Sequence, residues 1–247
     1  MFDHSIFYVF LRHIGATVNL WRIPYGTEGD LSAKAAPGTH EAVQSEMERL
    51  KIPKDADILE LASGTGFFLK RLMRLGYQRL TSVERDLNTF RLKEITPMTL
   101  DLNTRFSDSL KNKFDVIIAI EIIEHLNSPW EFLSEIKKLL KPGGTLILST
   151  PNVSFWLSRL QFLVNGYPKY FSDFDFKEQR HITPIFDHHM KIALHECGFT
   201  LDKHFSTGSS WGLILRLLTY PASLFFRMIN RGLNSDGNIN IYISRLS

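Results

Sequence analysis

The sequence predicts an α/β domain in which helices cover both faces of a mostly parallel β-sheet. Two short runs, 57–62 and 114–120, are almost continuously apolar, as expected of strands buried on both sides. Each run is followed by a segment with helical spacing of its apolar residues, at 67–75 and at 129–140. Repeated strand–helix units of this length imply right-handed crossovers and a parallel sheet.

Composition limits the possible classes of protein. The 247 residues suit one α/β domain with additions, and 44% apolar residues are enough for a sizeable core. A net charge of +3 is too small to imply a nucleic-acid partner by itself. The single cysteine, Cys197, excludes an internal disulfide and a cysteine-rich metal site. Because Arg12 interrupts the first apolar run, no signal peptide is predicted, and we expect a cytoplasmic protein, with peripheral membrane association as an alternative.

A glycine turn lies between the first predicted strand and its helix. Gly64 and Gly66 allow the backbone to approach a ligand closely, and the helix start offers unpaired N–H groups. A second apolar run, 79–83, ends at Glu84, and the interval from Gly64 matches the roughly 20-residue gap to a ribose-binding acid in nucleotide folds. The third glycine of the dinucleotide fingerprint is absent. A ligand with a ribose but no phosphate therefore fits this turn better than a pyrophosphate does.

The turn resembles the first motif of the Rossmann-like S-adenosylmethionine-dependent methyltransferases, usually E/D-x-G-x-G-x-G. The matching residues are Glu60, Ala62, Gly64 and Gly66, with Ala62 in place of the first glycine. The resemblance covers about Asp55 to Pro151 and is poor in both flanks. It implies S-adenosyl-L-methionine as cofactor and a seven-stranded, mostly parallel sheet that closes with an antiparallel strand. The alternating isoleucines of 239–243 suit that last strand.

The resemblance also implies roles for individual side chains. Glu60 holds the turn, the glycines face the methionine part of the cofactor, and Glu84 binds both ribose hydroxyls. Asp101, after the third strand, receives the adenine amino group. The alternative is that Glu84 and Asp101 do not bind the cofactor and are simply solvated acidic side chains at the ends of loops. The predicted cofactor-binding residues share a position at or beyond strand ends: Glu60, Ala62, Gly64, Gly66, Glu84, Asp101 and Glu121.

A polar constellation follows the run 114–120. If residues 121–125 form one helical turn, the spacings of three and four residues place the side chains of Glu121, Glu124 and His125 on the same side of that turn. Two carboxylates and an imidazole suit a divalent metal, preferably Mg²⁺ or Mn²⁺. His181 is the candidate fourth ligand, from the segment expected to cover the substrate.

The E-x-x-E-H string is similar to that of the ubiquinone-biosynthesis O-methyltransferases and of the small-RNA terminal 2′-O-methyltransferases. Both groups bring a later histidine to the metal, which implies Glu121, Glu124, His125 and His181 as ligands. The string also occurs in relatives without an established metal, where Glu121 borders the cofactor. In that case His125 or His181 is the candidate catalytic base.

The remaining segments give weaker predictions. Residues 39–50 and 87–94 are expected to be helical, and 97–100 to form a short strand.

The aromatic insertion 153–183 predicts an acceptor pocket for a ring-bearing or lipophilic molecule, or a small subdomain with its own core. The amphipathic segment 211–231 contains internal arginines and is not expected to span a membrane. We expect this segment to pack against the rest of the chain or against a second copy of it. The alternative is that the segment contacts a membrane surface.

These observations predict a helical cap at 1–50 and a methyltransferase domain at 51–247. The expected reaction is O-methylation of a small hydroxylated acceptor, namely a phenol or quinol, a lipid-linked precursor or a sugar. Two alternatives stay open: an RNA 2′-O-methyltransferase, against which the near-neutral charge weighs, and a non-catalytic membrane-associated protein with the same fold.

Overall fold

The computed structural model describes residues 26–29, 31–208, 220–221, 224–225, 228 and 237–247. The first half of the predicted cap at 1–50 and most of the segment 211–231 therefore lie outside the described residues. No helix within these ranges is both long and apolar enough to cross a membrane.

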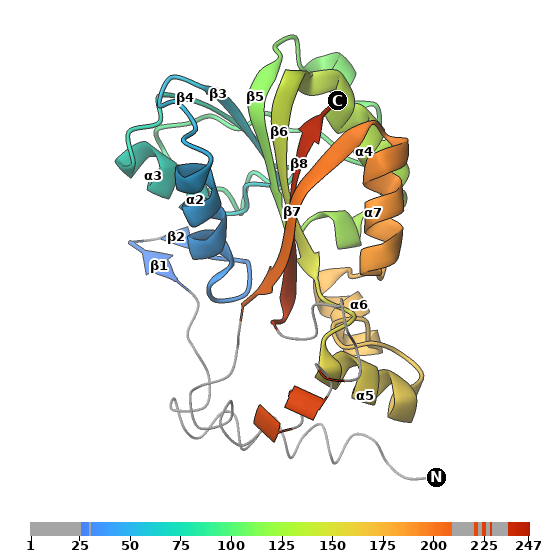
Figure 1. Cartoon of the computed structure of the whole chain (residues 1–247). Coiled ribbons are helices and arrows are strands. Elements are labelled where there is room, and N and C mark those ends of the chain that lie inside the picture. Colours follow the sequence, from blue (N-terminus) through green and yellow to red (C-terminus); the bar gives the residue numbers. More distant parts are fainter. Residues whose placement is uncertain (1–25, 30, 209–219, 222–223, 226–227, 229–236) are drawn as a thin grey trace.

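One central sheet organises the molecule (Figure 1). Its six strands are β3 (Asp57–Leu61), β4 (Arg79–Val83), β5 (Phe114–Ile120), β6 (Leu140–Pro151), β7 (Phe199–Thr207) and β8 (Ile239–Leu246). They are arranged in the order β4-β3-β5-β6-β8-β7. The strands β4, β3, β5 and β6 pair in parallel, and β8 pairs antiparallel with both β6 and β7. The predicted α/β class and the antiparallel closing strand are confirmed.

Helices cover both faces of the sheet, with α2 and α3 on one side and α4 and α7 on the other (Figure 1). The helices are α2 (Thr39–Arg49), α3 (Phe67–Arg74), α4 (Pro129–Leu139), α5 (Trp156–Asn165), α6 (Asp173–Gln179) and α7 (Asp187–Glu196). Shorter elements are the hairpin β1 (Thr27–Glu28) and β2 (Leu31–Ser32), and the 3₁₀ turns η1 (Phe106–Ser109) and η2 (Ile123–His125).

The core consists of two main apolar layers, one on each face of the sheet. Successive residues of a strand point to opposite faces. Accordingly, Ile117 packs in the layer that includes Phe132 of α4, whereas Ile118 packs in the layer that includes Phe68 of α3. The nearly continuous apolar character of 114–120 thus reflects a strand covered on both sides.

Two predicted elements are wrong. Residues 87–94 form turns rather than a helix, because the Asp86 side chain accepts hydrogen bonds from the Asn88 N–H and the Thr89 hydroxyl, both at 2.9 Å. Such local side-chain bonds compete with helix formation. The strand expected at 97–100 is reduced to one parallel bridge between Val83 and Met98, beside Pro97, which has no N–H to donate. The central sheet of the described residues therefore has six strands instead of the predicted seven.

Candidate active site

The glycine turn is held against the end of the neighbouring strand. The Gly64 N–H donates to Glu84 Oε2 at 2.7 Å, and the Asp86 N–H donates to Glu84 Oε1 at 3.0 Å. Because a carboxylate offers about four acceptor positions, both Glu84 oxygens can still accept further hydrogen bonds. The structure therefore directs Glu84 to the turn, and its contact with a ribose stays a prediction.

Three positions of the turn, Ala62, Gly64 and Gly66, have backbone conformations that favour glycine. Gly66, which begins α3, has φ +85°, and a Cβ there would lie 2.5 Å from Leu92 Cβ. Ala62, at the position where the motif usually has its first glycine, has φ +56°. A left-handed conformation costs an alanine about 1–2 kcal/mol. Ala62 therefore keeps the glycine-like backbone of the motif at an energetic cost.

A cavity of about 340 Å³ lies beyond the carboxyl ends of β3 and β5. Its volume is within the range of small-molecule sites, and its place is where ligands bind to open α/β sheets. Seven of the predicted site residues line it: Glu60, Ala62, Gly64, Glu121, Glu124, His125 and His181. Gly66 and Glu84 are not among the residues that line it, although Glu84 is bonded to Gly64, which does line it. Asp101 does not line it and instead accepts a hydrogen bond from the Asn103 N–H at 2.9 Å, which closes a local turn.

The segment before α2 contributes side chains that the sequence analysis did not select. The Thr65 hydroxyl donates to the Ser32 carbonyl at 2.8 Å, which places this segment over the glycine turn. Lys34 is the one lysine or arginine among the described residues that line the cavity, and its Cγ would be 3.4 Å from a Cβ on Gly64. His40 also lines the cavity and stacks on Phe68, with ring centroids 5.3 Å apart. Burial lowers the pKa of His40 to about 4.

Three buried carboxyl groups face the cavity. Burial raises the pKa of Glu60 and of Glu121 to about 8, and burial together with the nearby Glu121 raises the pKa of Glu124 well above its usual value. One oxygen of each carboxyl group has no hydrogen-bond partner. Buried polar atoms without a partner are rare and unfavourable, so they indicate a bound group or water. This wall of the cavity is therefore prepared for a cation or for hydrogen-bond donors.

Glu124, His125 and His181 form a compact group. One ligand atom from each residue lies within 4.8 Å of the other two. His181 Nδ1 is 2.8 Å from the Tyr170 carbonyl oxygen, and Glu124 Oε2 accepts from the Thr150 hydroxyl at 3.1 Å. Metal-binding histidines commonly use their second ring nitrogen in such a bond to a carbonyl group. The remaining atoms, His181 Nε2 and Glu124 Oε1, are then available as ligands.

Backbone hydrogen bonds explain how His181 reaches this group. The Ile182 and Thr183 N–H groups both donate to the Glu124 carbonyl at 3.0 Å, and the Thr183 hydroxyl donates to the Leu126 carbonyl at 2.6 Å. The segment that follows α6 is therefore fixed on the turn η2. The rings of His125 and His181 meet edge to face, with centroids 4.7 Å apart.

The protonation states of the two imidazoles suit metal binding. Burial, with the neighbouring His181, lowers the pKa of His125 to about 4, and burial also lowers the pKa of His181. Both rings are therefore neutral at neutral pH, which is the form that ligates metals. Glu121 has φ +49° and accepts from the Ala36 N–H at 3.3 Å, and it lies outside the group of mutually close ligand atoms. Its role as a metal ligand stays a prediction.

Comparison with known proteins identifies the family. A family model described as "Methyltransferase domain" matches residues 34–204. The chain therefore belongs to this family, the class I (Rossmann-like) S-adenosylmethionine-dependent methyltransferases, which confirms the resemblance seen in the sequence.

Similar proteins include ubiquinone biosynthesis O-methyltransferases. The protein of that name from Roseobacter denitrificans is 31% identical over 105 residues, which are 40% of this chain and 42% of the relative. The mitochondrial one from Dictyostelium discoideum is 24% identical over 119 residues, which are 40% of this chain and 36% of the relative. The chain thus matches less than half the length of these relatives.

Solved structures show the same fold. The magnesium protoporphyrin IX methyltransferase from Synechocystis, solved with bound SAH, has a TM-score of 0.58 at 14% identity. The similarity covers 85% of this chain and 82% of that chain.

Proposed function

We propose that the protein is an S-adenosylmethionine-dependent O-methyltransferase that acts on a small hydroxylated acceptor in the presence of a divalent cation. The observation that carries this proposal is that one cavity is lined both by the glycine turn and by a group of possible metal ligands. The glycine turn with Gly64 lies on one wall, and the Glu124–His125–His181 group lies on the other. The matches to ubiquinone biosynthesis O-methyltransferases support oxygen as the methylated atom.

The residues of the glycine turn fit the cofactor. Bound S-adenosylmethionine supplies a methyl group already activated on a sulfonium sulfur. Glu84, hydrogen-bonded to Gly64, would accept the ribose hydroxyls, and Lys34 would face the carboxylate of the methionine part. Because the methyl group is activated, the main task of these residues is to hold the cofactor in one orientation.

The second wall fits a divalent cation. Glu124, His125 and His181 would hold such a cation, which would lower the pKa of an acceptor hydroxyl. Because the raised pKa keeps Glu124 protonated, it would release its proton when a cation binds and so supply the negative charge, while His125 and His181 would contribute neutral nitrogens. In the transfer, the acceptor oxygen would form a bond to the methyl carbon as the carbon–sulfur bond breaks, and the hydroxyl proton would pass to a base. His125 or His181 is the candidate base if no cation is required, a role typically worth about 10²–10⁴-fold in rate.

The insertion supports a ring-bearing acceptor. Tyr170 lines the cavity, and Phe171 lies against His181 with ring centroids 5.6 Å apart. An acceptor near His181 would thus meet aromatic side chains, which suits a phenol or quinol better than a sugar.

Methyl transfer from radiolabelled S-adenosylmethionine tests the proposal. The acceptors would be a catechol, a quinol, a hydroxylated sugar and a short RNA, each assayed with chelator and after addition of Mg²⁺ or Mn²⁺. We expect labelling of the catechol or quinol that chelation abolishes and the metal restores. Full activity in chelator would exclude the cation, and labelling of the RNA alone would replace the proposed acceptor class.

A further inference from the structure

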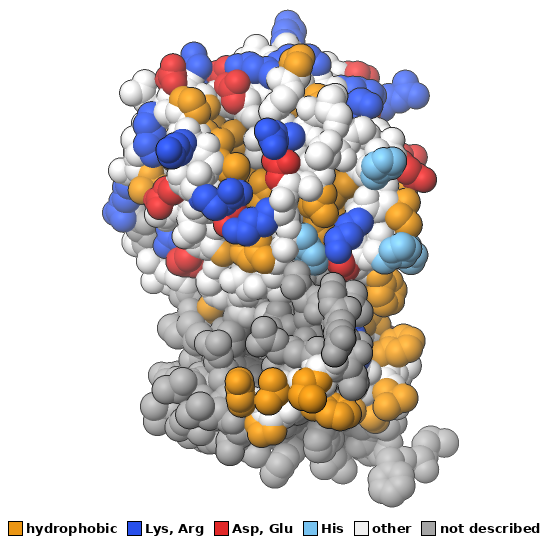
Figure 2. Space-filling view, viewed as in Figure 1, with side chains coloured by type: hydrophobic (Ala, Val, Ile, Leu, Met, Phe, Trp, Pro, Cys, Tyr) orange, Lys and Arg blue, Asp and Glu red, His pale blue; other side chains and the backbone are white. Residues whose placement is uncertain are grey.

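The insertion that brings His181 to the cavity takes little part in the apolar core. None of the described residues 156–183 belongs to the apolar clusters of that core. The helices α5 and α6 instead expose apolar side chains, namely Leu160, Phe162, Leu163, Val164, Phe174 and Phe176. Figure 2 shows hydrophobic side chains in a row along the lower edge of the molecule. The clusters of the core therefore do not by themselves fix where the insertion lies.

The two ends of the insertion are marked by buried polar side chains. Asn152 comes directly after β6 and before the insertion, and Asp187 follows the insertion as the first residue of α7. These two residues are only 0% and 5% exposed. Buried polar groups are costly unless hydrogen bonds compensate them. The partners of Asn152 and Asp187 therefore show what holds the insertion in place.

These partners come from the two antiparallel strands. His204 and Ser206 alternate along β7, and Asn240 and Tyr242 alternate along β8. The register pairs His204 with Tyr242 and Ser206 with Asn240. Residues two apart in a strand point to the same face of a sheet, so these four side chains form one polar block. The block lies on the face that α7 covers, because Tyr242 packs in the apolar layer that includes Met190 of α7.

The end of the insertion is tied to one half of this block. Asp187 Oδ1 accepts from the Tyr242 hydroxyl at 3.2 Å and lies 3.1 Å from His204 Nδ1. The His204 and Tyr242 rings stack, with centroids 4.4 Å apart and 3° between their planes. Asp187 Oδ2 accepts from Lys191, on the same helix, at 2.7 Å. Two buried rings thus direct the Asp187 carboxyl group to the strands, and the 41% exposed Lys191 side chain covers its outer side.

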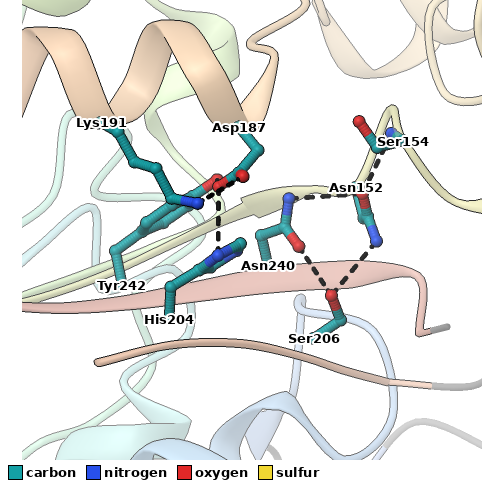
Figure 3. Close-up of polar contacts among 8 residues, drawn as sticks. All are labelled: Asn152, Ser154, Asp187, Lys191, His204, Ser206, Asn240 and Tyr242. Carbon is teal, nitrogen blue, oxygen red and sulfur yellow. Dashed lines mark hydrogen bonds and ion pairs between the residues drawn. The ribbon is translucent and has the colours of Figure 1, made fainter. Parts of the chain in front are cut away.

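The start of the insertion is tied to the other half. The Asn152 amide donates to the Ser206 hydroxyl at 3.2 Å, and the Asn152 Oδ1 accepts from the Ser154 N–H at 3.0 Å. Asn240 donates to the same Oδ1 at 3.3 Å and accepts from the Ser206 hydroxyl at 2.8 Å. Figure 3 shows Asn240 between this group and the His204 ring. Both ends of the insertion are therefore attached to one continuous polar block.

A short link connects this block to the cation wall. Only five residues, 182–186, separate His181 from Asp187. One of them is Pro184, whose ring fixes φ and so limits the freedom of the link. The N–H groups of the first two donate to the Glu124 carbonyl. A displacement of Asp187 would therefore shift the link, and with it the His181 ring relative to Glu124.

We propose that Asp187 and His204 are positioning residues, which hold the insertion so that His181 reaches Glu124. Neither is among the described residues that line the cavity, so both act through the backbone. Apolar side chains in place of a buried ionic pair are often neutral or stabilising, so stability alone does not require this pair. The effect on metal binding rests on the cation site of the proposed function, whereas the placement of the insertion can be measured without a metal.

Three measurements on the full chain test the proposal. Hydrogen–deuterium exchange, followed by mass spectrometry, reports the order of residues 167–183 without a metal. Titration of Mn²⁺ reports the cation wall, and binding of S-adenosylhomocysteine reports the glycine turn. We expect Asp187→Ala and His204→Ala to speed exchange in 167–183 but not in 57–83. Both should weaken Mn²⁺ binding by about 10–100-fold, as residues that orient metal ligands do, and leave binding of S-adenosylhomocysteine unchanged.

Glu135→Ala is the matched control. Glu135 is 6% exposed, accepts from the Ser107 hydroxyl at 2.6 Å and pairs with a lysine on its own helix, much as Asp187 does, but it lies on α4. This variant should be destabilised toward urea without a change in the exchange of 167–183 or in Mn²⁺ binding. His204→Asn places an amide nitrogen near the position of Nδ1, so it should restore both readouts relative to His204→Ala although it also lacks the ring.

Unchanged exchange or unchanged Mn²⁺ affinity in Asp187→Ala and His204→Ala overturns the proposal, and so do equal changes in Glu135→Ala. If Asp187→Ala does not fold, the comparison of His204→Ala with His204→Asn carries the same test. If the wild type binds no Mn²⁺ while the variants speed exchange in 167–183 alone, the proposed cation site fails and the positioning of the insertion is supported.

Discussion

The two walls of the cavity are built in different ways. The cofactor wall around Gly64 depends on the backbone conformation of the glycine turn, which Glu84 at the end of the next strand holds through the Gly64 N–H. The cation wall depends on side chains from distant segments, since His181 is brought to Glu124 by backbone bonds from Ile182 and Thr183. The first wall is a local motif, whereas the second exists only in the folded chain. The two walls should therefore fail independently when they are altered.

The largest effect is expected on the cation wall. Glu124→Gln removes the carboxyl group that would ionise on cation binding but keeps the shape and the bond to Thr150, and it should lower kcat by about 10²–10⁴-fold. Calorimetry should show unchanged affinity for S-adenosylhomocysteine. A parallel loss of cofactor affinity would mean that the two walls are one unit.

Buried His40 should make stability depend on pH. Its pKa is about 4 in the folded chain and about 6.5 in the unfolded chain, so the unfolded chain binds more protons between these values. The contribution of neutral His40 to the free energy of unfolding is fully present above about pH 6.5. It falls by about 3 kcal/mol as the pH decreases to about 4. Urea unfolding at several pH values measures this. The variant His40→Gln should lose this part of the slope, and an unchanged slope would contradict the assignment.

Glu84→Gln should weaken binding of S-adenosylhomocysteine by about 10–100-fold, since hydrogen bonds to charged groups contribute about 1.5–3 kcal/mol. Affinity for Mn²⁺ should be unaffected, which is the counterpart of the Glu124 experiment. If Glu84→Gln binds the cofactor normally, Glu84 only closes the turn.

Lys34→Met should produce a smaller and more selective change. The affinity for S-adenosylhomocysteine should fall by about tenfold, whereas methylthioadenosine, which lacks the amino-acid part, should bind as before. Equal losses for both ligands would indicate a general disturbance of the segment over Thr65. No binding of either ligand by the wild type would instead reject the proposed cofactor.

The sequence was sufficient for the features that are encoded locally. The buried strands, the glycine turn and the acid after the second strand follow from apolar runs and from the motif. The helix predicted at 87–94 is absent because the Asp86 side chain bonds to the residues that follow it. Lys34 and His40 line the cavity because the bond from Thr65 to Ser32 places their segment over the glycine turn, and no motif in the sequence indicates this contact. The separation of Glu121 from the other ligands involves a tertiary contact with Ala36, which no spacing in the sequence contains, whereas Asp101 is engaged in a local turn with Asn103.

Titration of Mn²⁺, followed by electron paramagnetic resonance, tests the central claim most directly, because it detects the ion without any acceptor. We predict one bound ion per chain, lost in His181→Ala and retained in Glu84→Gln. An absence of bound Mn²⁺ in the wild type, or the same binding after His181→Ala, would contradict the assignment of Glu124, His125 and His181 as a cation site.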